Sequence, residues 1–142
     1  MKNKMTVKFD SISQNEGFAR NVIASFILPL NPSVSDLSDV KTAVSEAVTN
    51  SIVHGYPDSV GEVVMTAEIS GNDVHITIAD CGIGIEDVDK AIEPFYTTKP
   101  NDERSGMGFT IIKTFMDDVK VVSKINCGTK IEMIKTISKQ AV

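Results

Sequence analysis

The feature that most restricts the fold is a pair of adjacent segments in which apolar and polar residues alternate. The segments are 62–70 (EVVMTAEIS) and 73–80 (DVHITIAD), joined by Gly71 and Asn72. Alternation with a period of two is typical of a strand with one buried face, and a Gly-Asn pair suits the tight turn of a hairpin. The centre of the chain therefore predicts an antiparallel hairpin whose apolar face must be covered by other elements.

Helical segments supply that cover. Apolar residues recur at helical spacing over 15–28, which Pro29 ends, and over 34–54, which Gly55 ends. A third helix, over 106–116, begins among glycines. The remaining predicted strands are 5–9, 118–125 and 128–138. This order predicts an α+β fold, a two-layer α/β sandwich in which helices cover one face of a mixed, mostly antiparallel sheet.

We expect one domain over residues 1–142, interrupted by an irregular polar stretch at about 86–105 that makes sense as a functional lid. The net charge of −5, without basic runs, argues against binding to nucleic acid or to an anionic membrane. The first residues lack the apolar core of a signal peptide, and Cys81 and Cys127 have no metal-binding spacing. A cytoplasmic location is expected.

The helix predicted at 34–54 carries an acid and an amide one turn apart, Glu46 and Asn50. At about 100° per residue, both project away from the apolar stripe formed by residues such as Val44 and Val48. Such residues usually form a solvated face. The alternative is a cleft, in which the Asn oxygen would bind Mg²⁺ and the carboxylate would deprotonate a hydroxyl. The choice between them depends on a phosphate site elsewhere in the chain.

Two glycine motifs are candidates for a nucleotide site. In DCGIG (80–84), Asp80 would accept a hydrogen bond from an adenine amino group while glycines let the backbone approach the base, although the motif also fits a simple turn. In ERSGMGFTII (103–112), Ser105 and glycines lead into an apolar helix, whose N-terminus suits phosphates, although a plain Ser N-cap fits too. Between the motifs, Lys99 and Arg104 are cations that would meet a terminal phosphate, or else are ordinary exposed residues.

Taken together, Glu-x-x-x-Asn, Asp-x-Gly-x-Gly and a later Gly-x-Gly resemble the GHKL ATPase superfamily, which includes histidine kinases and gyrase-type ATPases. Three further segments, EAVTNSIVHGY, EPFYTTKP and ERSGMGFTII, are similar to its anti-sigma F branch of small bacterial serine kinases. The similarity spans nearly the whole chain. It implies a Bergerat-type ATP-binding fold that uses ATP/ADP and Mg²⁺.

The resemblance also implies roles for single residues. Glu46 matches the catalytic base and Asn50 the Mg²⁺ ligand, and Asp80 matches the acid that recognises adenine. Arg104 matches a catalytic residue at the end of the lid. The other expected cofactor-binding residues are Gly82, Gly84, Thr98, Lys99, Ser105, Gly106, Met107, Gly108 and Thr129. Glu16 and Arg20 match a partner-binding surface, although their spacing also fits an ordinary ion pair.

By the same resemblance, the protein is a homodimer that holds a sporulation sigma factor of the F type and phosphorylates a serine of an anti-anti-sigma protein. Two alternatives stay open. One is a detached ATP-binding domain of a histidine kinase, acting on a histidine of another protein. The other is a nucleotide-gated binding module in which catalysis is incidental.

Overall fold

The computed structural model describes residues 1–92 and 108–138. The chain order of its elements is β1 (Lys2–Asp10), α1 (Gln14–Ile27), the 3₁₀ turn η1 (Leu28–Leu30), α2 (Val34–Asn50), the π turn η2 (Ser51–Gly55), β2 (Glu62–Ser70), β3 (Asp73–Asp80), α3 (Val88–Ile92), α4 (Gly108–Phe115), β4 (Asp118–Lys124) and β5 (Gly128–Thr136). The predicted helices and strands are all present, with ends shifted by a few residues.

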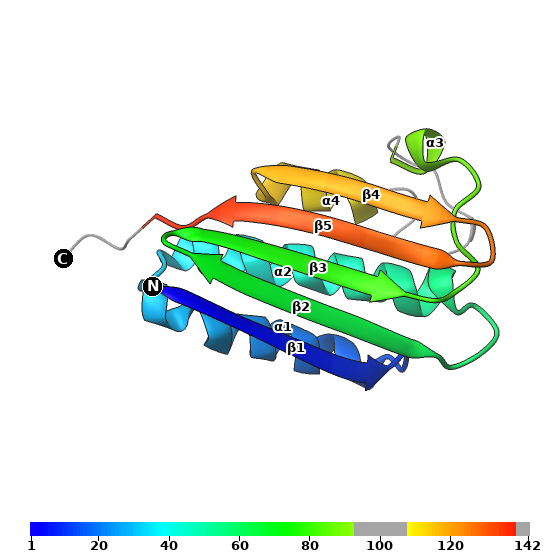
Figure 1. Cartoon of the computed structure of the whole chain (residues 1–142), viewed down its shortest axis with the longest axis horizontal. Helices are drawn as coiled ribbons and strands as arrows, with labels where there is room; N and C mark the ends of the chain where they lie inside the picture. The colour runs from blue at the N-terminus through cyan, green and yellow to red at the C-terminus, as the bar shows by residue number, and fades with distance from the viewer. Residues whose placement is uncertain (93–107, 139–142) are drawn as a thin grey trace.

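The five strands form one sheet in the order β1-β2-β3-β5-β4 (Figure 1). Each of its four pairings is antiparallel, so the sheet that we predicted as mixed and mostly antiparallel contains no parallel pair among the described strands. The predicted hairpin is confirmed: Ser70 pairs with Asp73, and Gly71 turns the chain with a φ of 63°. The C-terminal end of β3 and the start of β5 therefore lie side by side.

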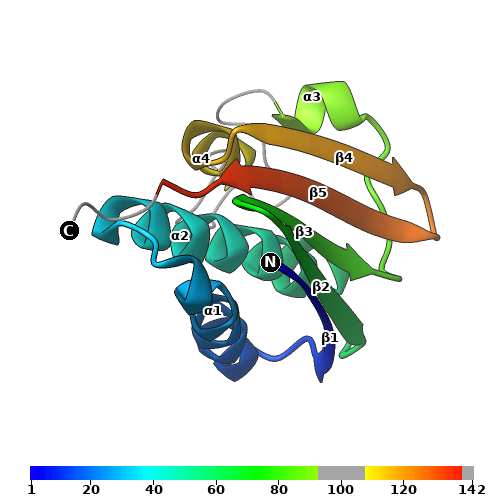
Figure 2. The same cartoon turned by 60° about the vertical axis from the view of Figure 1, so that its left-hand side comes forward.

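Helices α1, α2 and α4 cover one face of this sheet, and the other face carries no helix among the described residues (Figure 2). The predicted stripe of α2 is buried, with Val40, Val44 and Val48 fully excluded from solvent. Burying each valine contributes about 2 kcal/mol to stability. The two-layer α+β fold is thus confirmed, and packing of this stripe leaves Glu46 and Asn50 on a different side of α2.

The buried stripe of α1 differs from the apolar repeat that is most visible in the sequence. Phe18 heads that repeat, yet its exposed fraction is 47%, and the fully buried residues are Ala19, Ile23 and Ile27. Phe18 instead packs edge-on against Phe9, with 6.1 Å between ring centroids.

A buried cation fixes α4 relative to α2 and the sheet. The ammonium group of Lys135 on β5 donates to the carbonyl oxygen of Phe115 at 2.7 Å, at the C-terminal end of α4. It also contacts Asp39 Oδ2 at 3.3 Å and Asp36 Oδ1 at 3.9 Å, both on α2. A positive charge at a helix C-terminus is favourable, and the two carboxylates compensate for its burial. Lys135 therefore helps to fix the position of α4 on the sheet, and with it the position of the N-terminal end of α4.

Two predicted segments differ in detail. The helix predicted to continue to His54 widens into a π turn from Ser51, in which the amide of Tyr56 donates to the carbonyl of Ser51 at 3.0 Å. The predicted irregular lid begins with the short helix α3, and most of the lid lies outside the described residues. No helix in the described parts of the chain combines the length and apolar character that crossing a bilayer requires.

Candidate functional site

Asp80, the last residue of β3, is a buried carboxylate held by three donors. Its Oδ2 accepts from the hydroxyl of Ser51 at 2.8 Å. Its Oδ1 accepts from the backbone amides of Gly82 at 2.9 Å and Thr129 at 3.3 Å. An ionised carboxylate offers about four acceptor positions. The geometry therefore fixes the Asp80 side chain and leaves Oδ2 able to accept one further hydrogen bond.

Glycines keep the backbone close around this acid. A Cβ atom on Gly55, at the end of the π turn, would lie 3.0 Å from Asp80 Cγ and Oδ2. A Cβ on Gly82 would collide with the carbonyl oxygen of Gly55. Gly84 has a φ of 78° and packs against the carbonyl oxygen of Lys124, a combination that only glycine adopts without strain. Both glycines of the first motif thus shape the loop that follows Asp80.

Thr129 on β5 joins the same network. Besides its amide, which donates to Asp80, its Oγ1 lies 2.8 Å from the hydroxyl oxygen of Ser123. That hydroxyl oxygen in turn accepts from the amide of Ile85 at 2.7 Å. Thr129, one of the expected cofactor-binding residues, is therefore buried beside Asp80. It connects β4, β5 and the glycine loop.

The second part of the site is formed by α2 and the start of α4. A Cβ on Gly108, the first residue of α4, would lie 3.7 Å from Oε2 of Glu46. Asn50 follows Glu46 by one turn on α2, and both are half-buried. Glu46 of the predicted pair thus lies beside the N-terminus of α4, where helix amides and the helix dipole favour an anion.

Six of the predicted site residues cannot be placed against this geometry. Thr98, Lys99, Arg104, Ser105, Gly106 and Met107 lie outside the described residues. Their roles stay predictions.

Glu16 and Arg20, the predicted partner-binding pair, lie on α1 rather than around Asp80. Arg20 Nη1 is 3.2 Å from Glu16 Oε1, so the i,i+4 ion pair expected from their spacing is present. The same Glu16 oxygen also accepts a hydrogen bond from the hydroxyl of Ser45 on α2. The pair is therefore attached to the helix that carries Glu46.

Tyr56 supports the corner between the π turn and the glycine loop. Its hydroxyl donates to the carbonyl oxygen of Glu62 at 2.8 Å and accepts from the amide of Cys81 at 2.7 Å. Burial raises the pKa of Tyr56 above its usual value, and the nearby Asp80 charge adds to the rise. Cys81 itself is an exposed free thiol that directly follows Asp80.

Sequence reasoning missed several members of the Asp80 network. Ser51 lies on the apolar side of α2 by its angular position and is buried, and its hydroxyl donates to Asp80. The signal was a lone hydroxyl at the end of an otherwise apolar stripe. Gly55 was read only as a helix stop, and Tyr56 and Ser123 carried no recognisable pattern.

The described residues contain no group of three or more His, Cys, Asp or Glu side chains arranged to hold a metal ion. Mg²⁺ commonly keeps several waters and binds through one or two protein oxygens together with phosphates. Asn50, one turn along α2 from Glu46, carries an oxygen of the kind that Mg²⁺ binds.

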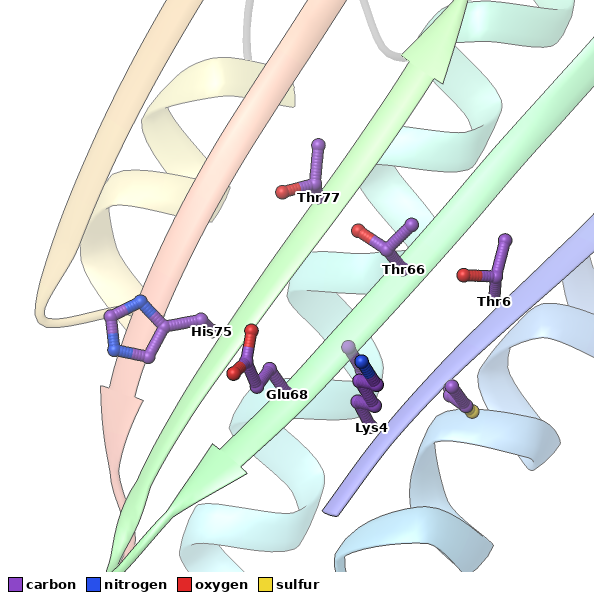
Figure 3. Close-up of a pocket in the computed structure, with 8 residues that line it drawn as sticks. Lys4, Thr6, Thr66, Glu68, His75 and Thr77 are labelled. Atoms are coloured by element: carbon purple, nitrogen blue, oxygen red, sulfur yellow. The ribbon is translucent and has the colours of Figure 1, made fainter. Parts of the chain in front are cut away.

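A separate hollow of about 500 Å³ lies on the helix-free face of the sheet (Figure 3). Lys4, Thr66, Glu68, His75 and Thr77 project into it from β1, β2 and β3. Because the inward-facing residues of β3 alternate with these, the hollow is on the opposite side of the sheet from the helices. His75 therefore lies on the opposite side of the sheet from α2, the helix that carries Glu46.

Comparison with known proteins agrees with this geometry. Residues 14–135 match the family model described as "Histidine kinase-like ATPase domain". A protein of Anoxybacillus flavithermus named "Anti-sigma F factor" is 51% identical over 140 residues, covering 98% of this chain and 96% of that protein.

Two solved structures share the fold at low sequence identity. One contains the RsbU and RsbW domains of Rv1364c from Mycobacterium tuberculosis; its TM-score is 0.72 at 18% identity, over 98% of this chain and 34% of the other. The second is full-length ShkA in complex with AMPPNP; its TM-score is 0.59 at 20% identity, over 89% and 31%. The family match, the high identity over nearly full length and the fold together show that the chain belongs to the GHKL superfamily of histidine kinase-like ATPase domains and, within it, to the anti-sigma F factor family.

Proposed function

We propose that the protein binds ATP with Mg²⁺ between α2, the glycine loop and the start of α4. The observation that carries this proposal is the fixed, buried Asp80 carboxylate, whose Oδ2 retains acceptor capacity next to the space that Gly55 leaves open. An adenine amino group is a donor that suits it. The fold neighbour ShkA was solved with AMPPNP, which supports a nucleotide as the ligand.

The triphosphate would then extend toward Glu46 and Gly108. Amides at the N-terminus of α4 favour its negative charge, and Asn50 would contribute one oxygen to Mg²⁺, which supplies charge neutralisation when bound. Lys99 and Arg104 would add positive charge at the terminal phosphate. The chain has no Walker-type phosphate-binding loop. In this proposal the phosphates are therefore bound by helix amides and lid residues.

The reaction that fits this arrangement is transfer of the γ-phosphoryl group to a protein serine. The serine oxygen attacks the γ-phosphorus, the bond to the β-phosphate oxygen breaks, and ADP leaves. Glu46 takes the hydroxyl proton, because a serine hydroxyl is a weak nucleophile at neutral pH. In this scheme the product is a phosphoserine on an anti-anti-sigma protein, which is thereby inactivated.

The protein would also hold a sporulation sigma factor of the F type inactive while ATP is bound, and act as a homodimer in the cytoplasm. The name of the Anoxybacillus relative supports a sigma factor as partner. On α1, the Glu16–Arg20 pair presents an arginine side chain that is 43% exposed, and arginine is enriched among the residues that dominate binding at protein interfaces. No direct nucleic-acid or membrane contact is part of the proposal.

The experiment is to incubate the protein with γ-labelled ATP, Mg²⁺ and the purified sigma and anti-anti-sigma proteins of its source. Acid-stable label on a serine of the anti-anti-sigma protein supports the proposal, whereas acid-labile label on a histidine supports the histidine-kinase alternative. Glu46→Gln is the matched variant: it should abolish labelling and leave ATP-dependent sigma capture intact. Wild-type protein that binds ATP and captures sigma, yet labels nothing, would favour a binding module.

A further inference from the structure

Ser45 is a buried serine whose hydroxyl faces a neighbouring helix rather than the sheet. Its exposed fraction is 8%, and it directly precedes Glu46 on α2. The hydroxyl donates to Oε1 of Glu16 on α1. Figure 2 shows α1 and α2 next to each other on the covered face of the sheet. A hydrogen bond from a buried hydroxyl to a carboxylate is stronger than one between neutral groups.

Glu16 Oε1 accepts from two sides at once. Arg20 Nη1 approaches it at 3.2 Å along α1, and Ser45 approaches it from α2. An exposed i,i+4 ion pair alone is weak, and both of its long side chains sample several rotamers. Here the Glu16 side chain is only 22% exposed, and a short, buried side chain fixes its carboxylate. The Arg20 guanidinium, whose side chain is 43% exposed, is therefore directed by an anchored partner.

We propose that Ser45 is a positioning residue that pre-organises the Glu16–Arg20 pair for protein binding. This inference rests on the proposed function of that pair as a partner surface. Ordering a flexible side chain when a complex forms costs affinity, and ordering it beforehand removes that cost. Ser45 would thereby make α2 contribute to partner recognition from beneath the surface, without itself touching the partner.

The test is a double-mutant cycle with Ser45→Ala and Glu16→Ala, read as affinity for the immobilised sporulation sigma factor of the source in the presence of ATP and Mg²⁺. Ser45→Ala should weaken sigma binding about five- to tenfold. Affinity for ATP should stay within about twofold, since the nucleotide contacts are made elsewhere on α2. In the Glu16→Ala background, Ser45→Ala should have no further effect on sigma binding. Ser45→Thr, which keeps the hydroxyl, should recover most of the affinity.

Ser38→Ala is the matched control, because Ser38 is an exposed serine on the same helix. Unchanged sigma affinity in Ser45→Ala would overturn the inference. A penalty of equal size with and without Glu16 would overturn it too, because the effect would then come from general loss of helix packing.

A second measurement separates the inference from the function on which it rests. NMR of the isolated protein reports rotation of the Arg20 guanidinium, which should be slowed in the wild type and faster in Ser45→Ala. If the wild type binds no sigma factor, the proposed function fails, and this rotation still decides whether Ser45 orders the pair. Equal rotation rates in both proteins would overturn the positioning role.

Discussion

Replacing Asp80 by asparagine should separate nucleotide recognition from folding. An asparagine oxygen in the place of Oδ1 still accepts from the amides of Gly82 and Thr129, and the hydroxyl of Ser51 can rotate to accept from the new amide nitrogen. The three contacts survive without charge assistance, so the free energy of unfolding should fall by about 1 to 2 kcal/mol.

Recognition of the base should suffer much more. The atom that would accept from the adenine amino group becomes a donor, so a charge-assisted hydrogen bond is lost and two donors face each other. The expected loss is about 3 kcal/mol of binding free energy, or about a hundredfold in Kd for ATP. Isothermal titration calorimetry measures the Kd, and thermal unfolding in the same buffer measures stability.

Two further variants make the comparison sharp. Asp80→Ala leaves the amides of Gly82 and Thr129 buried without an acceptor, and should cost about 4 kcal/mol of stability. Asp73→Asn is the control, because Asp73 lies at the opposite, exposed end of the same strand. ATP binding by Asp80→Asn within threefold of wild type would refute the reasoning that Asp80 reads the adenine amino group.

Three other changes have defined outcomes. Glu46→Gln should lower the rate of phosphoryl transfer by about 100-fold or more, with little change in the Kd for ATP, in single-turnover assays; an unchanged rate would exclude Glu46 as the base. For Tyr56 the raised pKa means that its contribution to stability is fully present below pH 10.0 and is lost as the pH rises through the folded-state value. Urea unfolding should therefore show a steeper loss of stability at alkaline pH in the wild type than in Tyr56→Phe, and identical pH profiles would contradict this. Lys135→Met leaves the Phe115 carbonyl without its ammonium donor and two aspartates without their cation. It should lower the free energy of unfolding in urea by about 3 kcal/mol. A loss below about 0.5 kcal/mol would show that the buried cation does not stabilise the packing of α4.

Much of the fold was predictable because the strongest patterns belong to elements with one buried face. Alternation over 62–80 and the valine stripe of α2 each admit one arrangement, and the hairpin register follows from Gly71 and Asn72. The buried stripe of α1 was less predictable. Phe18 is far more hydrophobic than Ala19, so hydrophobic spacing favours Phe18 as the core residue, yet Phe18 is exposed and Ala19 is buried.

The site was predictable where residue type alone limits the chemistry. Asp80 and the glycines after it lie where their motif suggested, and Glu46 lies beside the start of α4. The supporting contacts were not predictable, since they depend on which strands become neighbours. Ser51 contacts Asp80 from the first position of the π turn that follows α2, and no local propensity predicts that turn.

The most direct test of the account is a crystal structure of the protein with a non-hydrolysable ATP analogue and Mg²⁺. The account predicts the adenine amino group within hydrogen-bond distance of Asp80 Oδ2, and Mg²⁺ bound to Asn50 and the phosphates at the start of α4. A nucleotide bound away from Asp80, or a metal ion far from Asn50, would contradict it.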